Sequence, residues 1–163
     1  MIAELGNYAL ALSLAVSFFL AIFPLWGAEK GHPQLMSLAR PMTYGLFFSL
    51  TIAFAALFYL FAVNDFSVQY VVNNSNSNLP IYYRLSAVWG SHEGSLLLWI
   101  WLLTLWGAAV ALFSKHLPQE AVARVLGIMG IISIGFLLFV LFTSNPFTRT
   151  FPDFPVDGRE LNP

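Results

Sequence analysis

Residues 89–99, WGSHEGSLLLW, place two ionisable side chains at the start of a long apolar segment. His92 and Glu93 begin like a zinc-binding HExxH helix, but the chain continues with Gly-Ser-Leu and lacks the second histidine. A glycine-rich phosphate loop and a recognisable Ser/His/Asp set are also missing from the sequence. We therefore expect no catalytic residue and no metal site, and we expect His32 and His116 to be solvated.

Two interpretations of this stretch remain open. Ser91 is a candidate helix N-cap, which would place His92 and Glu93 in the first turn, where the helix dipole favours a carboxylate. In addition, His92, Trp99 and Trp106 are spaced by seven residues, so they share one stripe of a helix. An indole inside a membrane needs a flat surface to pack on, and either a neighbouring helix or a large planar ligand supplies one. Packing against a helix is the commoner case.

The composition limits the chemistry available to the chain. It contains no cysteine, so thiol chemistry in its surroundings belongs to another protein. Its formal net charge is −1, which gives no indication of a nucleic-acid partner.

The elements that must position these residues are long apolar helices. Of 163 residues, 58% are hydrophobic and 9% are charged, and the charges leave four uncharged stretches at 5–28, 41–64, 94–114 and 125–148. About 20 residues of helix cross the hydrocarbon core of a bilayer, whereas a membrane barrel shows shorter alternating segments. We predict an all-α, polytopic integral membrane protein with four transmembrane helices at about 5–27, 42–63, 92–113 and 122–143. The first run lacks a basic leader, so we interpret it as a retained helix.

The connecting segments set the orientation. The two short connectors carry four of the seven Lys and Arg residues, which predicts that they are cytoplasmic and that both termini, the loop 64–91 and the tail 144–163 lie outside. The Asn/Ser run at 73–78 favours turns. The preceding residues 66–72 alternate in polarity and suit an extended edge segment or an interfacial loop. The proline-rich tail is expected to be non-helical.

At this point the motifs match a known family. YYRLSAVWGSHEGSLLLW at 82–99 follows VNDFSVQYVVNNSNSNLP at 63–80, and FLLFVLFTSNPFTRTFPDFPVDGRELNP occupies 136–163. Together they closely resemble the N-terminal portion of the CcmF family, the membrane haem lyase component of bacterial cytochrome c maturation. A close relative of that family serves the cytochrome c nitrite reductase.

The resemblance implies a multi-pass protein of the bacterial inner membrane. Such proteins receive haem from a haem chaperone at the periplasmic face and help to join it, by thioether bonds, to apocytochrome c. It implies thiol-reducing and apocytochrome-binding maturation proteins as further partners, besides the lipid bilayer. The full-length family carries a b-type haem, but its tryptophan-rich segment and haem-ligand histidines are not in this chain. The chain would hold about a quarter of the family's length, and we expect it to be inactive alone.

The residues that we associate with support of a haem site come from the shared motif. We hypothesise that His92 and Glu93 order the outer loops beside the haem, and that Arg84 neutralises Glu93 or a haem propionate. A helix cap with a local ion pair is the simpler explanation. The full set is Arg84, Trp89, Gly90, His92, Glu93, Gly94, Ser95 and Trp99.

Two other functions are alternatives to haem handling. A transporter or channel subunit would need ionisable residues deep inside the helices, but each Asp, Glu, Lys, Arg and His falls at a predicted helix end or in a loop. A structural membrane scaffold would bind partners through the loop 64–91.

Overall fold

The computed structural model of the chain describes residues 1–150 and 155–158, and these residues are mainly helical. Within that part of the chain, the only strand-like pairing is an isolated antiparallel bridge between Val68 and Arg149. The seven helices are α1 (Ile2–Lys30), α2 (Pro33–Ser37), α3 (Ala39–Ala62), α4 (Gln69–Asn74), α5 (Ile81–Ala87), α6 (His92–Phe113) and α7 (Gln119–Phe142).

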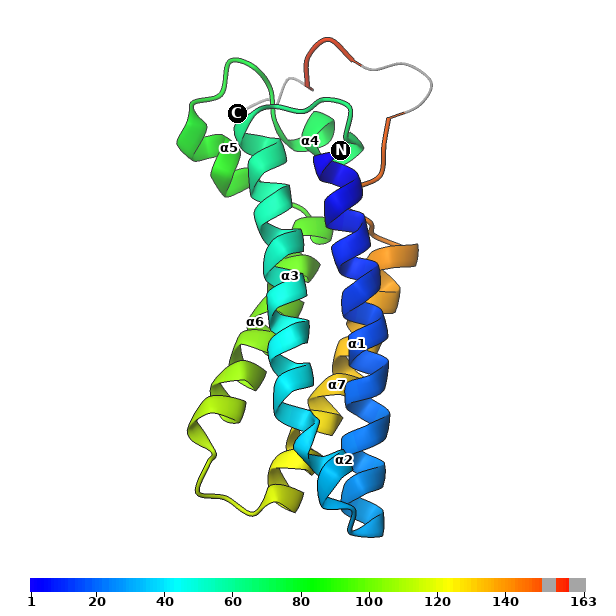
Figure 1. Cartoon of the computed structure of the whole chain (residues 1–163). Coiled ribbons are helices and arrows are strands. Elements are labelled where there is room, and N and C mark those ends of the chain that lie inside the picture. The colour runs from blue at the N-terminus through cyan, green and yellow to red at the C-terminus, as the bar shows by residue number, and fades with distance from the viewer. Residues whose placement is uncertain (151–154, 159–163) are drawn as a thin grey trace.

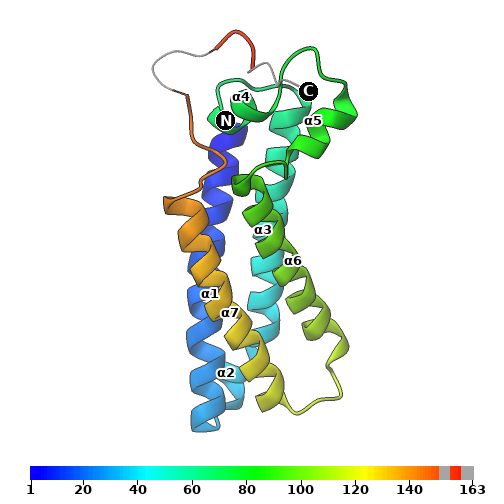
Figure 2. The ribbon, with the colours of Figure 1, turned by 180° about the vertical axis from the view of Figure 1, so that it is seen from behind.

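Four of these helices run side by side as an elongated bundle (Figures 1 and 2). α1 packs against α3 and α7, and α6 closes the bundle by packing against α3 and α7. Four helical segments, 2–30, 33–62, 92–113 and 119–142, are long and apolar enough to cross a membrane. The predicted all-α class with four membrane helices is therefore confirmed.

Small and weakly polar residues hold the bundle together. Gly130 of α7 lies so close to α1 that a Cβ atom there would be 3.0 Å from the backbone nitrogen of Ala21. Between α1 and α3, the buried hydroxyls of Ser13 and Ser49 are hydrogen-bonded at 2.7 Å. Such close approach and interhelical hydrogen bonding are typical of membrane bundles, where lipid offers no hydrophobic force between helices.

The bundle has two chemically different ends. We call the end with residues 31–38 and 114–118 the connector end, and the opposite end, with the N-terminus, α4 and α5, the loop end (Figure 1). The connector end carries four of the seven basic residues, namely Lys30, Arg40, Lys115 and Arg124. In the described part of the chain, the loop end carries two basic and four acidic residues, namely Arg84, Arg149, Glu4, Asp65, Glu93 and Asp157.

The prediction of an extended edge segment at 66–72 was wrong from Gln69 onward, whereas the alternative of an interfacial loop stays a prediction. Residues from Gln69 onward form α4, and only Val68 is extended and paired with the tail. Tyr70, Val71 and Val72 are all buried, which a strand with one buried face cannot achieve. The side-chain amide of Asn74 also donates to the carbonyl of Tyr70 at 2.9 Å and closes the helical turn.

The other connecting segments contain short helices as well. α2 lies in the first connector and α5 in the loop 64–91, whereas the Asn/Ser run forms a turn after Asn74. The described part of the tail, 144–150 and 155–158, is non-helical as expected. Residues 151–154 and 159–163 of the predicted tail lie outside the described residues.

Candidate functional site at the loop end

The start of α6 is built around Ser91, Tyr70 and Asn74. Ser91 is the N-cap residue of α6, but its side chain does not cap the helix and instead donates to the Oδ1 atom of Asn74 at 2.8 Å. The Tyr70 hydroxyl donates to the carbonyl oxygen of Val88 at 3.0 Å and accepts from the Ser91 N–H at 3.4 Å. α4 therefore supports the turn between α5 and α6 through Tyr70 and Asn74, and we call this arrangement of Tyr70, Asn74, Val88 and Ser91 the loop-end corner.

The raised pKa of Tyr70 suits its role as a hydrogen-bond donor to Val88. Burial, with the nearby Glu93 charge as a smaller contribution, raises the pKa of Tyr70 to about 12. The phenol consequently stays neutral, and keeps its proton to donate to Val88, at any physiological pH.

Gly94 fits where no other residue would. A Cβ atom on Gly94 would lie 1.7 Å from the carbonyl oxygen of Val88 and 2.4 Å from the Tyr70 hydroxyl. Both distances are far below van der Waals contact, and the first involves backbone that cannot rotate away. The Gly in the HEG motif is thus explained by close packing of α6 on the corner.

Glu93 faces a small polar cavity. Its side chain is 24% exposed, and its Oε2 atom is buried and accepts no hydrogen bond from the described residues. Among the described residues, the ionisable side chain nearest to that oxygen in an ion-pair geometry is His92, whose Nδ1 lies 3.4 Å away. The cavity, of about 180 Å³, is also lined by Gln69, Tyr70, Asn73, Thr143, Ser144, Asn145 and Thr148. A carboxylate among neutral amides and hydroxyls is suited to receive a cationic or hydrogen-bond-donating group.

His92 stands between this cavity and an apolar groove. The groove, of about 440 Å³, lies between α6 and α7 and is lined by His92, Ser95, Leu96, Trp99, Phe136 and Phe139. Trp99 is 66% exposed and Trp106 is 68% exposed on the same helix. The predicted stripe is therefore real, but within the described bundle it faces outward and does not pack against the neighbouring helices.

The tryptophan that does pack inward is Trp101, which the sequence analysis did not single out. Its Nε1 donates to the Thr51 hydroxyl of α3 at 3.0 Å, and its ring stacks on Phe54 at a centroid distance of 5.6 Å. The available signal was its offset by four residues from Leu97, which places both on the buried face.

Arg84 does not reach Glu93. Its Nε donates to the carbonyl of Leu79 at 2.7 Å, and its Nη2 donates to the carbonyl of Ser77 at 2.9 Å. Asp157 of the tail contacts the same turn by accepting a hydrogen bond from the N–H of Ser77. Hydrogen bonds from Ser77 hold the pKa of Asp157 below its usual range. Arg84 thus stabilises the Asn/Ser turn, and an ion pair with Glu93 is not formed.

The remaining motif residues support the corner locally. Trp89 is 44% exposed and packs against Phe58 of α3 at a centroid distance of 5.8 Å. Gly90 lies between α5 and α6. The Ser95 hydroxyl donates back to the carbonyl of Ser91 within the first turn of α6.

A second charged cluster at the loop end was not predicted. The guanidinium of Arg149 donates to Glu4 through Nε at 2.9 Å and also contacts Ser67, with Asp65 at 3.8 Å. Together with the Val68 bridge, these contacts attach the tail to α1 and to the segment before α4. The partners are far apart in sequence, so no local pattern could have identified the cluster.

Comparison with known proteins gives a consistent result. The family described as cytochrome C assembly protein matches residues 89–163. The whole chain is 89% identical to the cytochrome c-type biogenesis protein CcmF of Haemophilus influenzae and 44% identical to NrfE of the same organism, covering 25% and 26% of those proteins. A solved structure titled cytochrome c heme lyase CcmF superimposes with a TM-score of 0.85 at 30% identity, over 90% of this chain and 25% of that one.

The bundle has the helices of a polytopic membrane protein, and residues 89–163 are similar to the cytochrome C assembly protein family. More particularly, the chain is similar along its whole length to CcmF proteins. It spans about a quarter of the length of the curated relatives that it matches.

Proposed function

We propose that this chain acts in cytochrome c biogenesis, as part of a membrane haem lyase component that helps to attach haem covalently to apocytochrome c. Its own contribution is to form and orient the loop-end corner. The observation that carries this proposal is the match to CcmF relatives along the entire chain, at 89% identity to the protein of Haemophilus influenzae. A haem chaperone, thiol-reducing and apocytochrome-binding proteins, and apocytochrome c would be its partners.

The described residues form an apolar surface against which haem could pack, but they do not form a complete haem site. The aromatic side chains of the α6–α7 groove suit the flat, apolar face of a porphyrin. However, His92 is the one histidine at the loop end, its side chain is 69% exposed, and it already neighbours Glu93. We therefore propose that the ligands of a b-type haem lie elsewhere in the protein.

We propose further that the protein lies in the bacterial inner membrane with the loop end on the periplasmic side. The concentration of Lys and Arg at the connector end supports this orientation, because short basic loops stay in the cytoplasm. With four spans, the N-terminus and residue 143 share one side, so both the N-terminus and the tail would be periplasmic.

The structure gives little support to a transporter or channel. In the described residues, the buried polar side chains of the bundle are serines and threonines, and no ionisable side chain is buried midway along a long helix.

Replacing Glu93 with glutamine in the full-length protein tests the role of the corner. Glutamine keeps the size of the side chain but removes the charge that faces the polar cavity. If the carboxylate receives a hydrogen bond from a group that enters the cavity, that bond contributes about 1.5–3 kcal/mol, so its loss is expected to lower the yield of haem-linked cytochrome c roughly tenfold. The measurement is haem-stained cytochrome per amount of membrane protein, in cells that lack their own copy of the gene.

The control is Glu120→Gln. Glu120 also lies in the first turn of a membrane helix, α7, but at the connector end, where it pairs with Arg124 at 2.6 Å. We expect this variant to keep its yield. If Glu93→Gln also kept its yield at unchanged protein level, Glu93 would be left with a capping role only.

A further inference from the structure

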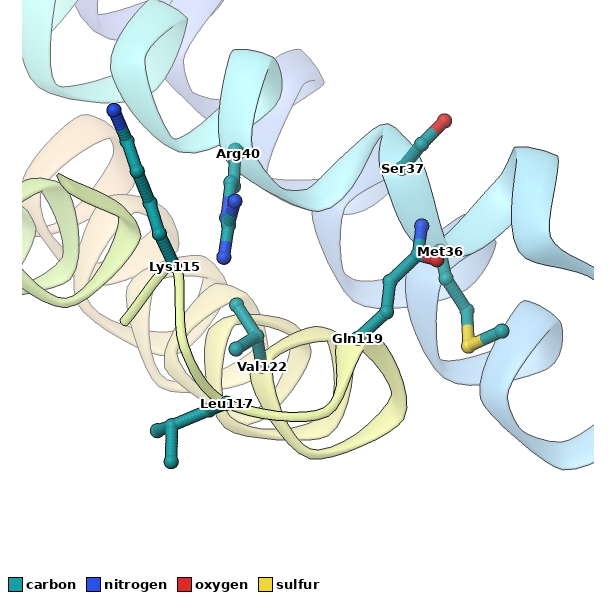
Figure 3. Close-up of a pocket in the computed structure, with 7 residues that line it drawn as sticks. All are labelled: Met36, Ser37, Arg40, Lys115, Leu117, Gln119 and Val122. Carbon is teal, nitrogen blue, oxygen red and sulfur yellow. The ribbon is translucent and has the colours of Figure 1, made fainter. Parts of the chain in front are cut away.

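A basic cavity lies at the connector end, far from the loop-end corner. It has a volume of about 290 Å³ and is bounded by α2, the start of α3 and the connector between α6 and α7 (Figure 3). Arg40 and Lys115 line it, together with Gln119 and the apolar side chains of Met36, Leu117 and Val122. Among the described residues no acidic side chain lines the cavity, so the positive charges of Arg40 and Lys115 are not neutralised by the lining residues.

The two cationic side chains that line the cavity come from different elements. Figure 3 shows the Arg40 guanidinium in the middle of the lining residues, with the Lys115 side chain extended beside it. Arg40 comes from the first turn of α3, whereas Lys115 follows the end of α6. Because both side chains line one cavity, an anion bound there would be attracted by two positive charges.

Most of the hydrogen-bonding capacity of this pair is unused. A guanidinium has five N–H donors, and among the described residues that of Arg40 makes one hydrogen bond, to the carbonyl of Ser114 at 3.0 Å. Neither Arg40 nor Lys115 takes part in an ion pair of the described chain. The nearby carboxylate of Glu120 is already paired with Arg124.

The position of the cavity matches the headgroup layer of a membrane. The membrane-spanning segment that contains Arg40 begins at Pro33, and α6 ends at Phe113, so both cations lie where a helix leaves the lipid. Apolar side chains such as Leu117 line the same cavity and would contact the glycerol and the first methylenes of a lipid. Basic pockets between membrane helices are known to take the headgroups of anionic phospholipids.

We propose that this cavity binds a negatively charged phosphate group between Arg40 and Lys115, as presented by the headgroup of an anionic phospholipid. The site would anchor the connector end at the membrane surface and fix the packing of α2 against the α6–α7 connector. This role is separate from haem attachment at the loop end and does not depend on it.

Lipid binding to the purified full-length protein tests the proposal. Delipidated protein in mild detergent is titrated with phosphatidylglycerol or with phosphatidylcholine, and bound lipid is counted by native mass spectrometry. A parallel arm measures the thermal midpoint with inorganic phosphate. The variants are Lys115→Gln, Arg40→Gln and the control Lys30→Gln, which removes a charge at the same end but outside the cavity lining.

We expect phosphatidylglycerol to bind about fivefold more weakly to Lys115→Gln and to Arg40→Gln, and to bind Lys30→Gln like the original protein. Lys115→Gln is the decisive variant, because Lys115 makes no described hydrogen bond whose loss could unfold the connector. A different outcome is that inorganic phosphate stabilises the original protein but not Lys115→Gln, with no preference between the two lipids. That result would support the phosphate site but identify its ligand as soluble phosphate and not as a lipid headgroup. Unchanged binding of both probes in Lys115→Gln and Arg40→Gln, or an equal loss in Lys30→Gln, would overturn the proposal.

Discussion

Gly94→Ala is expected to abolish most cytochrome c maturation by the full-length protein and to lower its stability. The added methyl group would lie 1.7 Å from the carbonyl oxygen of Val88, so the turn before α6 must move, and the Tyr70 hydroxyl must move with it. Overpacking costs about 1–3 kcal/mol, and displacement of the Tyr70 hydrogen bond adds about 1 kcal/mol. We expect haem-linked cytochrome to fall by more than about tenfold.

The control for this substitution is Gly135→Ala. A Cβ atom on Gly135 meets nothing within 4 Å, so alanine fits there and favours the helix by about 0.5–1 kcal/mol. We expect unchanged maturation and an unchanged or higher thermal midpoint. Full activity of Gly94→Ala would show that the corner tolerates displacement and does not order the site.

Gly130→Leu is expected to separate α1 from α7 and to destabilise the whole bundle. A Cβ atom at Gly130 already lies 3.0 Å from the backbone nitrogen of Ala21 and 3.1 Å from the side chain of Leu20. The remaining three carbons of leucine would clash with the backbone of α1. The backbone cannot relieve the clash by changing rotamer, as a side chain could. We expect a loss of about 3 kcal/mol or more, measured as a lower thermal midpoint of the purified protein and a lower yield in membranes.

Gly135→Leu is the matched comparison, because it introduces the same side chain into open space on the same helix. Its outward face meets lipid, where leucine is well accommodated. Equal midpoints for Gly130→Leu and Gly135→Leu would contradict the close α1–α7 packing that we describe.

The membrane helices could be predicted from sequence because one strong physical constraint determines them. A segment that crosses lipid must form its backbone hydrogen bonds internally and expose few charges. A long uncharged stretch is therefore typical of a membrane helix. α6 begins at His92, and the ionisable residues His92 and Glu93 directly precede the uncharged stretch 94–114. The family resemblance was also available from the sequence, because the HEG motif and its flanks are continuous in the chain.

The interior of the site could not be predicted, because it depends on contacts between distant residues. Tyr70 lies next to Gly94 only after α4 has folded back, and α4 itself interrupts a segment that alternates like a strand. Arg84 is near Glu93 in sequence, yet it binds the carbonyls of the Asn/Ser turn. Which tryptophan of α6 faces the bundle depends on the direction of its buried face, and that face contains Trp101.

The most direct test of this account is the side of the membrane on which the loop end lies. The chain has no cysteine, so Asn78→Cys in the loop before α5 and His116→Cys in the α6–α7 connector can each provide the only thiol of this segment. Any cysteines elsewhere in the full-length protein are replaced by serine, and intact cells are treated with a membrane-impermeant maleimide that enters the periplasm. We predict labelling of Asn78→Cys in intact cells and of His116→Cys only after lysis. Labelling of His116→Cys in intact cells, with Asn78→Cys protected until lysis, would contradict a periplasmic site for haem attachment at the loop-end corner.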